Sequence, residues 1–151
     1  MGWFKRSAPQ AAPTGPVITD LRDAERAWVA ECLASLDGAE ADIVALGTAY
    51  DEALRGWTAT APDPEHRPDP NVLINRLGVG FGEHVRLRTG MSWVVASDEY
   101  GTELALHGQP GDVLLYPANL VAKRWVAGEA GVLPELAAAL IERVTHIREQ
   151  R

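Results

Sequence analysis

The chain has 151 residues, of which 46% are hydrophobic and 23% charged, values typical of one globular domain. Its formal net charge is −7, and an acidic surface repels phosphate backbones, so nucleic acid is not an expected partner. The single cysteine, Cys32, excludes an intramolecular disulfide, and we interpret it as a buried, unreactive thiol. No apolar run approaches the ~20 residues of a membrane-spanning helix, and the first residues do not follow the order of a signal peptide. These features predict a soluble, cytoplasmic protein.

Residues 1–18 are expected to form a flexible N-terminal tail, and residues 19–151 a single α+β domain. The segment Ser7–Pro16 contains three prolines and one glycine but no large apolar side chain, so it is not expected to form a packed element. Trp3 and Phe4 leave several interpretations open: they dock on the domain, contact a partner or a membrane surface, or stay unattached.

An N-terminal helical hairpin is predicted next. Apolar residues at helical spacing indicate a first helix from about Asp20 to Leu36, which Thr19 or Asp20 caps. The short link Asp37–Gly38 ends it, and a second helix follows from about Ala39 to Leu54, with Gly56 after it. Residues 58–70 are rich in proline and predict a surface loop within the domain.

A third, glycine-bearing helix is predicted from Pro70 or Asn71 to Thr89, with Gly90 as its C-cap. Glycines at 78, 80 and 82 each cost about 1 kcal/mol in a helix relative to alanine, so their presence predicts close backbone packing against the sheet or another helix. A nucleotide-binding loop is not expected, because it would need a preceding strand, whereas these glycines lie inside a helical pattern.

The periodicity then changes to that of strands, and short glycine-containing turns predict a three-stranded antiparallel meander. The expected strands are Met91–Ser97, Thr102–His107 and Val113–Tyr116. A short helix, Ala118–Trp125, and a C-terminal helix from Leu133 to about Arg148 complete the predicted α+β fold.

Two strings in this region carry a family resemblance: Trp93-Val-Val-Ala-Ser-Asp-Glu-Tyr-Gly-Thr and Gly111-Asp-Val-Leu-Leu-Tyr-Pro-Ala-Asn-Leu-Val-Ala-Lys-Arg. Together with the glycine-bearing helix before them, they resemble the bacterial family called domain of unknown function 3806. The resemblance covers about residues 72–126 and implies an α+β domain, without implying an activity. Only two of the 14 basic residues are lysines, Lys5 and Lys123, a bias that also indicates a GC-rich bacterial genome.

The sequence favours a protein that is not an enzyme. No two of its four histidines have a metal-ligand spacing, and no nucleophile motif is present, so neither a metal nor a cofactor is expected. His84 and His107 remain the histidines that could approach Asp98 or Asp112 in space. Paired carboxylates such as Asp98-Glu99 are interpreted as solvated turn residues.

One set of polar and aromatic residues is a candidate binding site. Lys123 is the only lysine outside the predicted tail, which suggests a site that uses a compact ammonium group, and Asn119 shares its helix face at a spacing of four residues. Asp98 or Asp112 could pair with Lys123 or Arg124. The alternative is a structural salt bridge with an Asn cap and a core tryptophan. The candidate binding residues are Trp93, Asp98, Tyr100, Asn119, Lys123 and Arg124.

Two functional classes follow. The first is a non-enzymatic protein-interaction module, such as an adaptor or an immunity-type protein, with a protein partner. The second is a small-molecule binder, or an enzyme without a recognisable motif, with its site between the meander and the helices.

Overall fold

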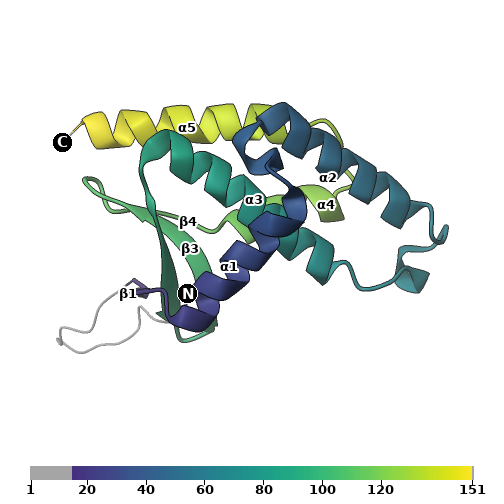
Figure 1. The fold of residues 1–151 in the computed structure, drawn as a ribbon, viewed down its shortest axis with the longest axis horizontal. Coiled ribbons are helices and arrows are strands. Elements are labelled where there is room, and N and C mark those ends of the chain that lie inside the picture. The colour runs from purple at the N-terminus through teal and green to yellow at the C-terminus, as the bar shows by residue number, and fades with distance from the viewer. Residues whose placement is uncertain (1–14, 151) are drawn as a thin grey trace.

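The computed structural model describes residues 15–150, and the predicted positions of Trp3 and Phe4 lie outside this range. The described part is an α+β fold in which a four-stranded antiparallel sheet is combined with five α-helices (Figure 1). The helices are α1 (Asp23–Leu36), α2 (Ile43–Thr58), α3 (Asn71–Thr89), α4 (Pro117–Val126) and α5 (Leu133–Glu149). The strands are β1 (Val17–Asp20), β2 (Ser92–Asp98), β3 (Gly101–Gly108) and β4 (Val113–Leu115).

The strands follow the order β1-β2-β3-β4, so β1 and β4 are the two edges of the sheet. In the β2–β3 hairpin, Asp98 faces Gly101, and in the β3–β4 pair, Leu106 faces Leu115. This confirms the predicted meander, in which links of a few residues impose antiparallel pairing.

The fourth strand, β1, was not predicted. Val17 and Ile18 fall in the predicted tail and Asp20 in the predicted first helix, but all three belong to a strand that pairs with β2. Helix α1 therefore begins at Asp23, and the first-turn carboxylate of Glu25 accepts a hydrogen bond of 2.6 Å from the Arg22 N–H. The predicted three-stranded sheet and the predicted cap at Thr19 or Asp20 are both wrong.

Helix α2 also differs at both ends from its expected range. A short 3₁₀ turn, Ala39–Ala41, precedes it, and the Asp42 carboxylate caps it by accepting from the Val44 and Ala45 N–H groups. The helix continues through Gly56 to Thr58. A glycine inside a helix costs only about 1 kcal/mol relative to alanine. The packing of the rest of α2 can offset this cost, so the helix does not end at Gly56.

Helix α3 has the predicted bounds at both ends, and its glycines have the predicted role. It crosses the centre of the molecule and contacts α1, α2, α4 and α5 (Figure 1). A Cβ at Gly78 would lie 2.7 Å from the Ala118 Cα, and a Cβ at Gly82 would lie 2.3 Å from the Trp93 ring. The first glycine lets α4 approach α3, and the second admits the Trp93 ring from β2.

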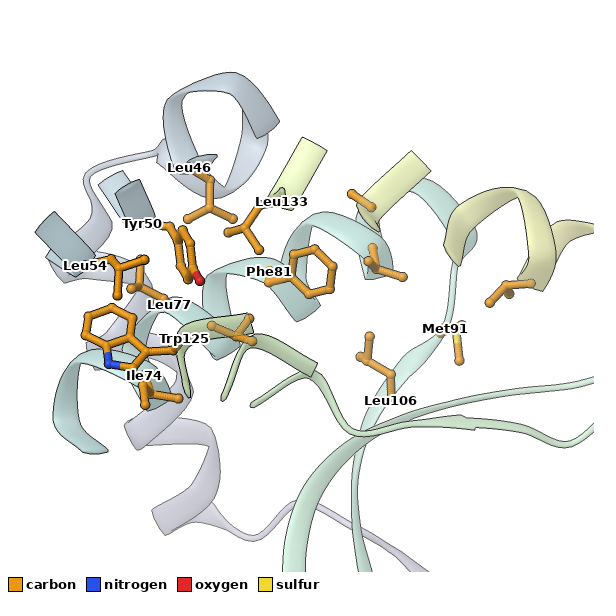
Figure 2. Close-up of a cluster of buried hydrophobic side chains, with 14 of the residues drawn as sticks. Leu46, Tyr50, Leu54, Ile74, Leu77, Phe81, Met91, Leu106, Trp125 and Leu133 are labelled. Atoms are coloured by element: carbon orange, nitrogen blue, oxygen red, sulfur yellow. The ribbon is translucent and has the colours of Figure 1, made fainter. Parts of the chain in front are cut away.

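The main core lies between α3 and the elements around it. Figure 2 shows Tyr50 of α2 beside Trp125 of α4, and Phe81 of α3 between them and the Met91–Leu106 pair. The Tyr50 and Trp125 rings meet edge to face with centroids 5.8 Å apart, a favourable aromatic geometry. Burial of the Trp125 indole therefore ties α4 to the helical part of the fold.

Candidate functional site: a groove between β4 and α4

An open groove of about 710 Å³ lies between strand β4 and helix α4. We call it the β4–α4 groove. Most of its lining is apolar, and Val126 at the end of α4 is 83% exposed. The lining residues are Leu114, Leu115, Tyr116, Asn119, Leu120, Ala122, Lys123, Val126 and Ala127.

The groove follows the outer edge of the sheet. Three consecutive residues, Leu114 to Tyr116, line it, although successive side chains of a strand point to opposite faces. Leu115 packs against the main core, whereas Leu114 and Tyr116 pack with the cluster of Val94 and Ala105 on the other face. Because residues from both faces line the space, we infer that it runs along the edge of β4. Within residues 15–150, only β3 pairs with β4, so this edge has no strand partner in the described part of the chain.

Two polar residues of the predicted site stand on the wall of this groove. Asn119 and Lys123 are four residues apart on α4, and both line the space, as their shared helix face predicted. Asn119 Nδ2 donates to the Glu103 carboxylate at 3.1 Å, which fixes the amide. Lys123 is exposed and adds one positive charge to an otherwise apolar wall.

The other predicted site residues lie elsewhere. Asp98 accepts from the Tyr100 N–H at 2.8 Å within the β2–β3 turn, and Tyr100 is 74% exposed there. Arg124 faces Glu129, with Nε and Oε1 3.8 Å apart. In the described part of the structure, no ion pair joins Asp98 to Lys123 or Arg124. The six candidates are thus divided among four places: the groove, the β2–β3 turn, the Arg124–Glu129 pair and the surroundings of Trp93.

Trp93, the remaining candidate, belongs to a partly buried polar cluster around Glu83, which sequence reasoning missed. Its Nε1 donates to Glu83 Oε1 at 2.9 Å, and Arg86 donates to both Glu83 oxygens at 2.8 and 2.7 Å. Burial favours a raised pKa for the Glu83 carboxyl, but the hydrogen bonds from Arg86 and Trp93 outweigh it and hold the pKa below its ordinary value. Glu83 and Arg86 are three residues apart on α3, and opposite charges at this spacing in a helix can form an ion pair. This spacing could have indicated the pair from the sequence.

The histidines take structural positions. Of the pairings left open, His107 approaches Asp112, with Nε2 and Oδ1 2.7 Å apart. His84 is buried, and burial lowers its pKa despite a hydrogen bond from Nδ1 to the Glu40 carbonyl at 3.2 Å. Among residues 15–150, no three His, Cys, Asp or Glu side chains form a group that could hold a metal ion. None of the helices in this range is long and apolar enough to cross a membrane.

The apolar residues that form most of the groove were not among the predicted site residues. Leu114, Leu120 and Val126 are ordinary core candidates by sequence, because an apolar side chain in a strand or helix usually packs inward. Their position beside an edge strand depends on the tertiary arrangement of α4.

Comparison with known proteins gives one match. A search of curated proteins and a search of solved structures each found no similar protein. Residues 61–135, about half of the chain, match the family model described as Domain of unknown function (DUF3806). This range contains α3, β2, β3, β4 and α4, and therefore the whole groove. The chain belongs to the DUF3806 family.

Proposed function

We propose that this protein is an interaction module that binds an extended segment of another protein in the β4–α4 groove. The observation that carries the proposal is the groove beside β4, an edge strand that has no second strand partner within residues 15–150. A bound segment can there add a fifth strand to the sheet through main-chain hydrogen bonds, while its side chains enter the apolar space. The proposal assigns no catalytic residue.

The lining of the groove defines the chemistry of the partner segment. Apolar side chains of the segment would contact Leu120 and Val126, and burial of one such side chain contributes about 1.5–3 kcal/mol. Lys123 would pair with a carboxylate of the segment, which Asn119 could support from the same helix face. We therefore expect a β-strand-forming, apolar segment that carries one acidic group.

The acidic charge of the chain favours a partner that is basic outside this segment. A net charge of −7 attracts a positively charged protein and speeds its encounter with the module. Within this proposal, an adaptor and an immunity-type protein remain the two alternatives, and the identity of the partner protein decides between them.

Selection from a phage-displayed library of random peptides tests the proposal. Peptides enriched on the immobilised protein are expected to combine apolar residues with an acidic one. Val126→Asp should weaken their binding at least tenfold, which is about 1.4 kcal/mol, because it places a charge in the apolar space. Lys123→Glu should select against acidic peptides.

Val44→Asp is the matched control, because Val44 is also an exposed valine on a helix, at 67% exposure, but lies outside the groove. It should leave binding unchanged. Selected peptides that bind Val126→Asp and wild type equally well would contradict the proposal.

A further inference from the structure

A second cavity, which we call the tryptophan cleft, lies between helices α1, α3 and α4 and the sheet. Its volume of about 270 Å³ is close to the lower limit for small-ligand pockets, which begins at roughly 300 Å³. The cleft is distinct from the β4–α4 groove, with which it shares only Asn119. Its main lining residues are Trp28, Asn75, Val79, Trp93, Glu103 and Asn119.

Two tryptophans from different elements line the cleft. Trp28 comes from α1 and is 40% exposed. Trp93 comes from β2 and is held by the hydrogen bond from its Nε1 to Glu83. A Cβ at Gly82 would lie 2.3 Å from the Trp93 ring, so the ring also packs directly on the α3 backbone. The Trp93 indole is thus fixed in place before any ligand arrives.

One polar residue gives the cleft a negative charge. Among the lining residues within 15–150, Glu103 is the only ionisable one, and its carboxylate already accepts from Asn119 Nδ2 at 3.1 Å. No Lys, Arg or His side chain is among the described residues that line the cleft; Arg76 lines a neighbouring depression instead. A carboxylate beside aromatic rings, without a competing cation, suits a positively charged ligand.

From this arrangement we propose that the tryptophan cleft binds a small organic cation of the quaternary ammonium type. The faces of indole rings attract such cations, and the carboxylate of Glu103 adds a direct charge interaction. The net charge of −7 raises the local concentration of cations around the protein. The proposal does not depend on peptide binding in the β4–α4 groove.

Choline and its neutral isostere 3,3-dimethylbutan-1-ol, which have the same shape, are the probes that test the cleft. In NMR titrations of the protein, choline should shift the indole N–H signals of Trp28 and Trp93 with a saturable curve. The signals of Trp57 and Trp125, which lie outside the cleft, should not move. The neutral isostere should bind about tenfold more weakly, because it lacks the cation–π and charge interactions.

Two glutamine variants distinguish the effect of the Glu103 carboxylate on choline affinity from the effect of the protein's net charge. Glu103→Gln should weaken choline binding about fivefold or more, a loss of roughly 1 kcal/mol. Glu99→Gln removes the same charge from the exposed β2–β3 turn outside the cleft and should leave the affinity unchanged. Equal affinity for choline and its isostere, no saturable shift at Trp28 and Trp93, or equal effects of the two variants would each overturn the proposal. The affinity of Glu103→Gln for a selected peptide, compared with that of the wild type, shows whether binding in the β4–α4 groove is independent of binding in the tryptophan cleft.

Discussion

Replacing Gly78 with alanine is expected to lower the free energy of unfolding by about 2 kcal/mol. The new Cβ would lie 2.7 Å from the Ala118 Cα and 3.2 Å from its backbone nitrogen. A backbone contact cannot be relieved by a rotamer change, so α3 and α4 must separate. Alanine's greater helix propensity returns up to about 1 kcal/mol, but overpacking of 1–3 kcal/mol or more exceeds it. Urea denaturation measures the difference.

Gly56→Ala is the control for this substitution. Gly56 also lies inside a helix, α2, but apart from its chain neighbours and the adjacent backbone of α2, no atom of the described residues lies within 4 Å of the position that its Cβ would take. The same change should therefore stabilise the protein by up to about 1 kcal/mol through helix propensity alone. If Gly78→Ala stabilised the protein as Gly56→Ala does, this would contradict the close contact between α3 and α4 at Gly78. Since α4 carries one wall of the groove, loss of this contact should also weaken peptide binding.

Truncation of Glu83 to alanine is expected to cost about 2 kcal/mol of stability. The substitution leaves the half-buried Trp93 Nε1 without its acceptor and the partly exposed Arg86 without its carboxylate. Glu142→Ala on the exposed surface of α5 is the control and should change stability by less than about 0.5 kcal/mol. Thermal or urea unfolding of both variants gives the comparison, and equal effects would refute the role assigned to the Glu83 cluster.

The Glu83 cluster also predicts how stability depends on pH. Because the fold lowers the Glu83 pKa below its ordinary value of 4.5, the carboxylate stabilises the folded state above that pH. This contribution is lost as the pH falls through the lower, folded-state pKa. The advantage of the wild type over Glu83→Gln should therefore be constant near neutral pH and shrink below about pH 4.5. A stability difference that stays constant down to the acid transition would contradict this linkage.

Helix α3 and the meander could be predicted because their signals are local. The glycines at 78, 80 and 82 are too costly for a solvent-facing helix, and the structure places Ala118, Leu36 and Trp93 directly against them. Strand β1 could not be predicted in the same way. Its four residues pair with β2, more than 70 residues later in the chain, and Thr19 and Asp20 also fit a helix cap. The pairing is non-local, so the local sequence indicated a tail and a helix cap and gave no sign of a strand.

The same holds for the candidate site: some of its residues could be placed from local sequence spacing, and others depend on the tertiary structure. The spacing of Asn119 and Lys123 was sufficient to place them on one helix face, and both line the groove. Arg124 follows Lys123 directly, but one residue along a helix turns by about 100°, so it points elsewhere and faces Glu129. In the part of the chain that the structure describes, Asp98 lies in the β2–β3 turn and makes no ion pair with Lys123, because its position depends on strand register and on the direction of α4, which no local pattern contains.

Hydrogen–deuterium exchange of the backbone amides, with and without a saturating peptide selected on the protein, tests the central claim most directly. If the peptide adds a strand beside β4, the amides of Leu114–Tyr116 should exchange more slowly in the complex. The other edge strand, β1, is an internal control and should exchange at the same rate in both states. Slower exchange at β1, or unchanged exchange at Leu114–Tyr116 in the saturated complex, would contradict the assignment of the β4–α4 groove as the docking site.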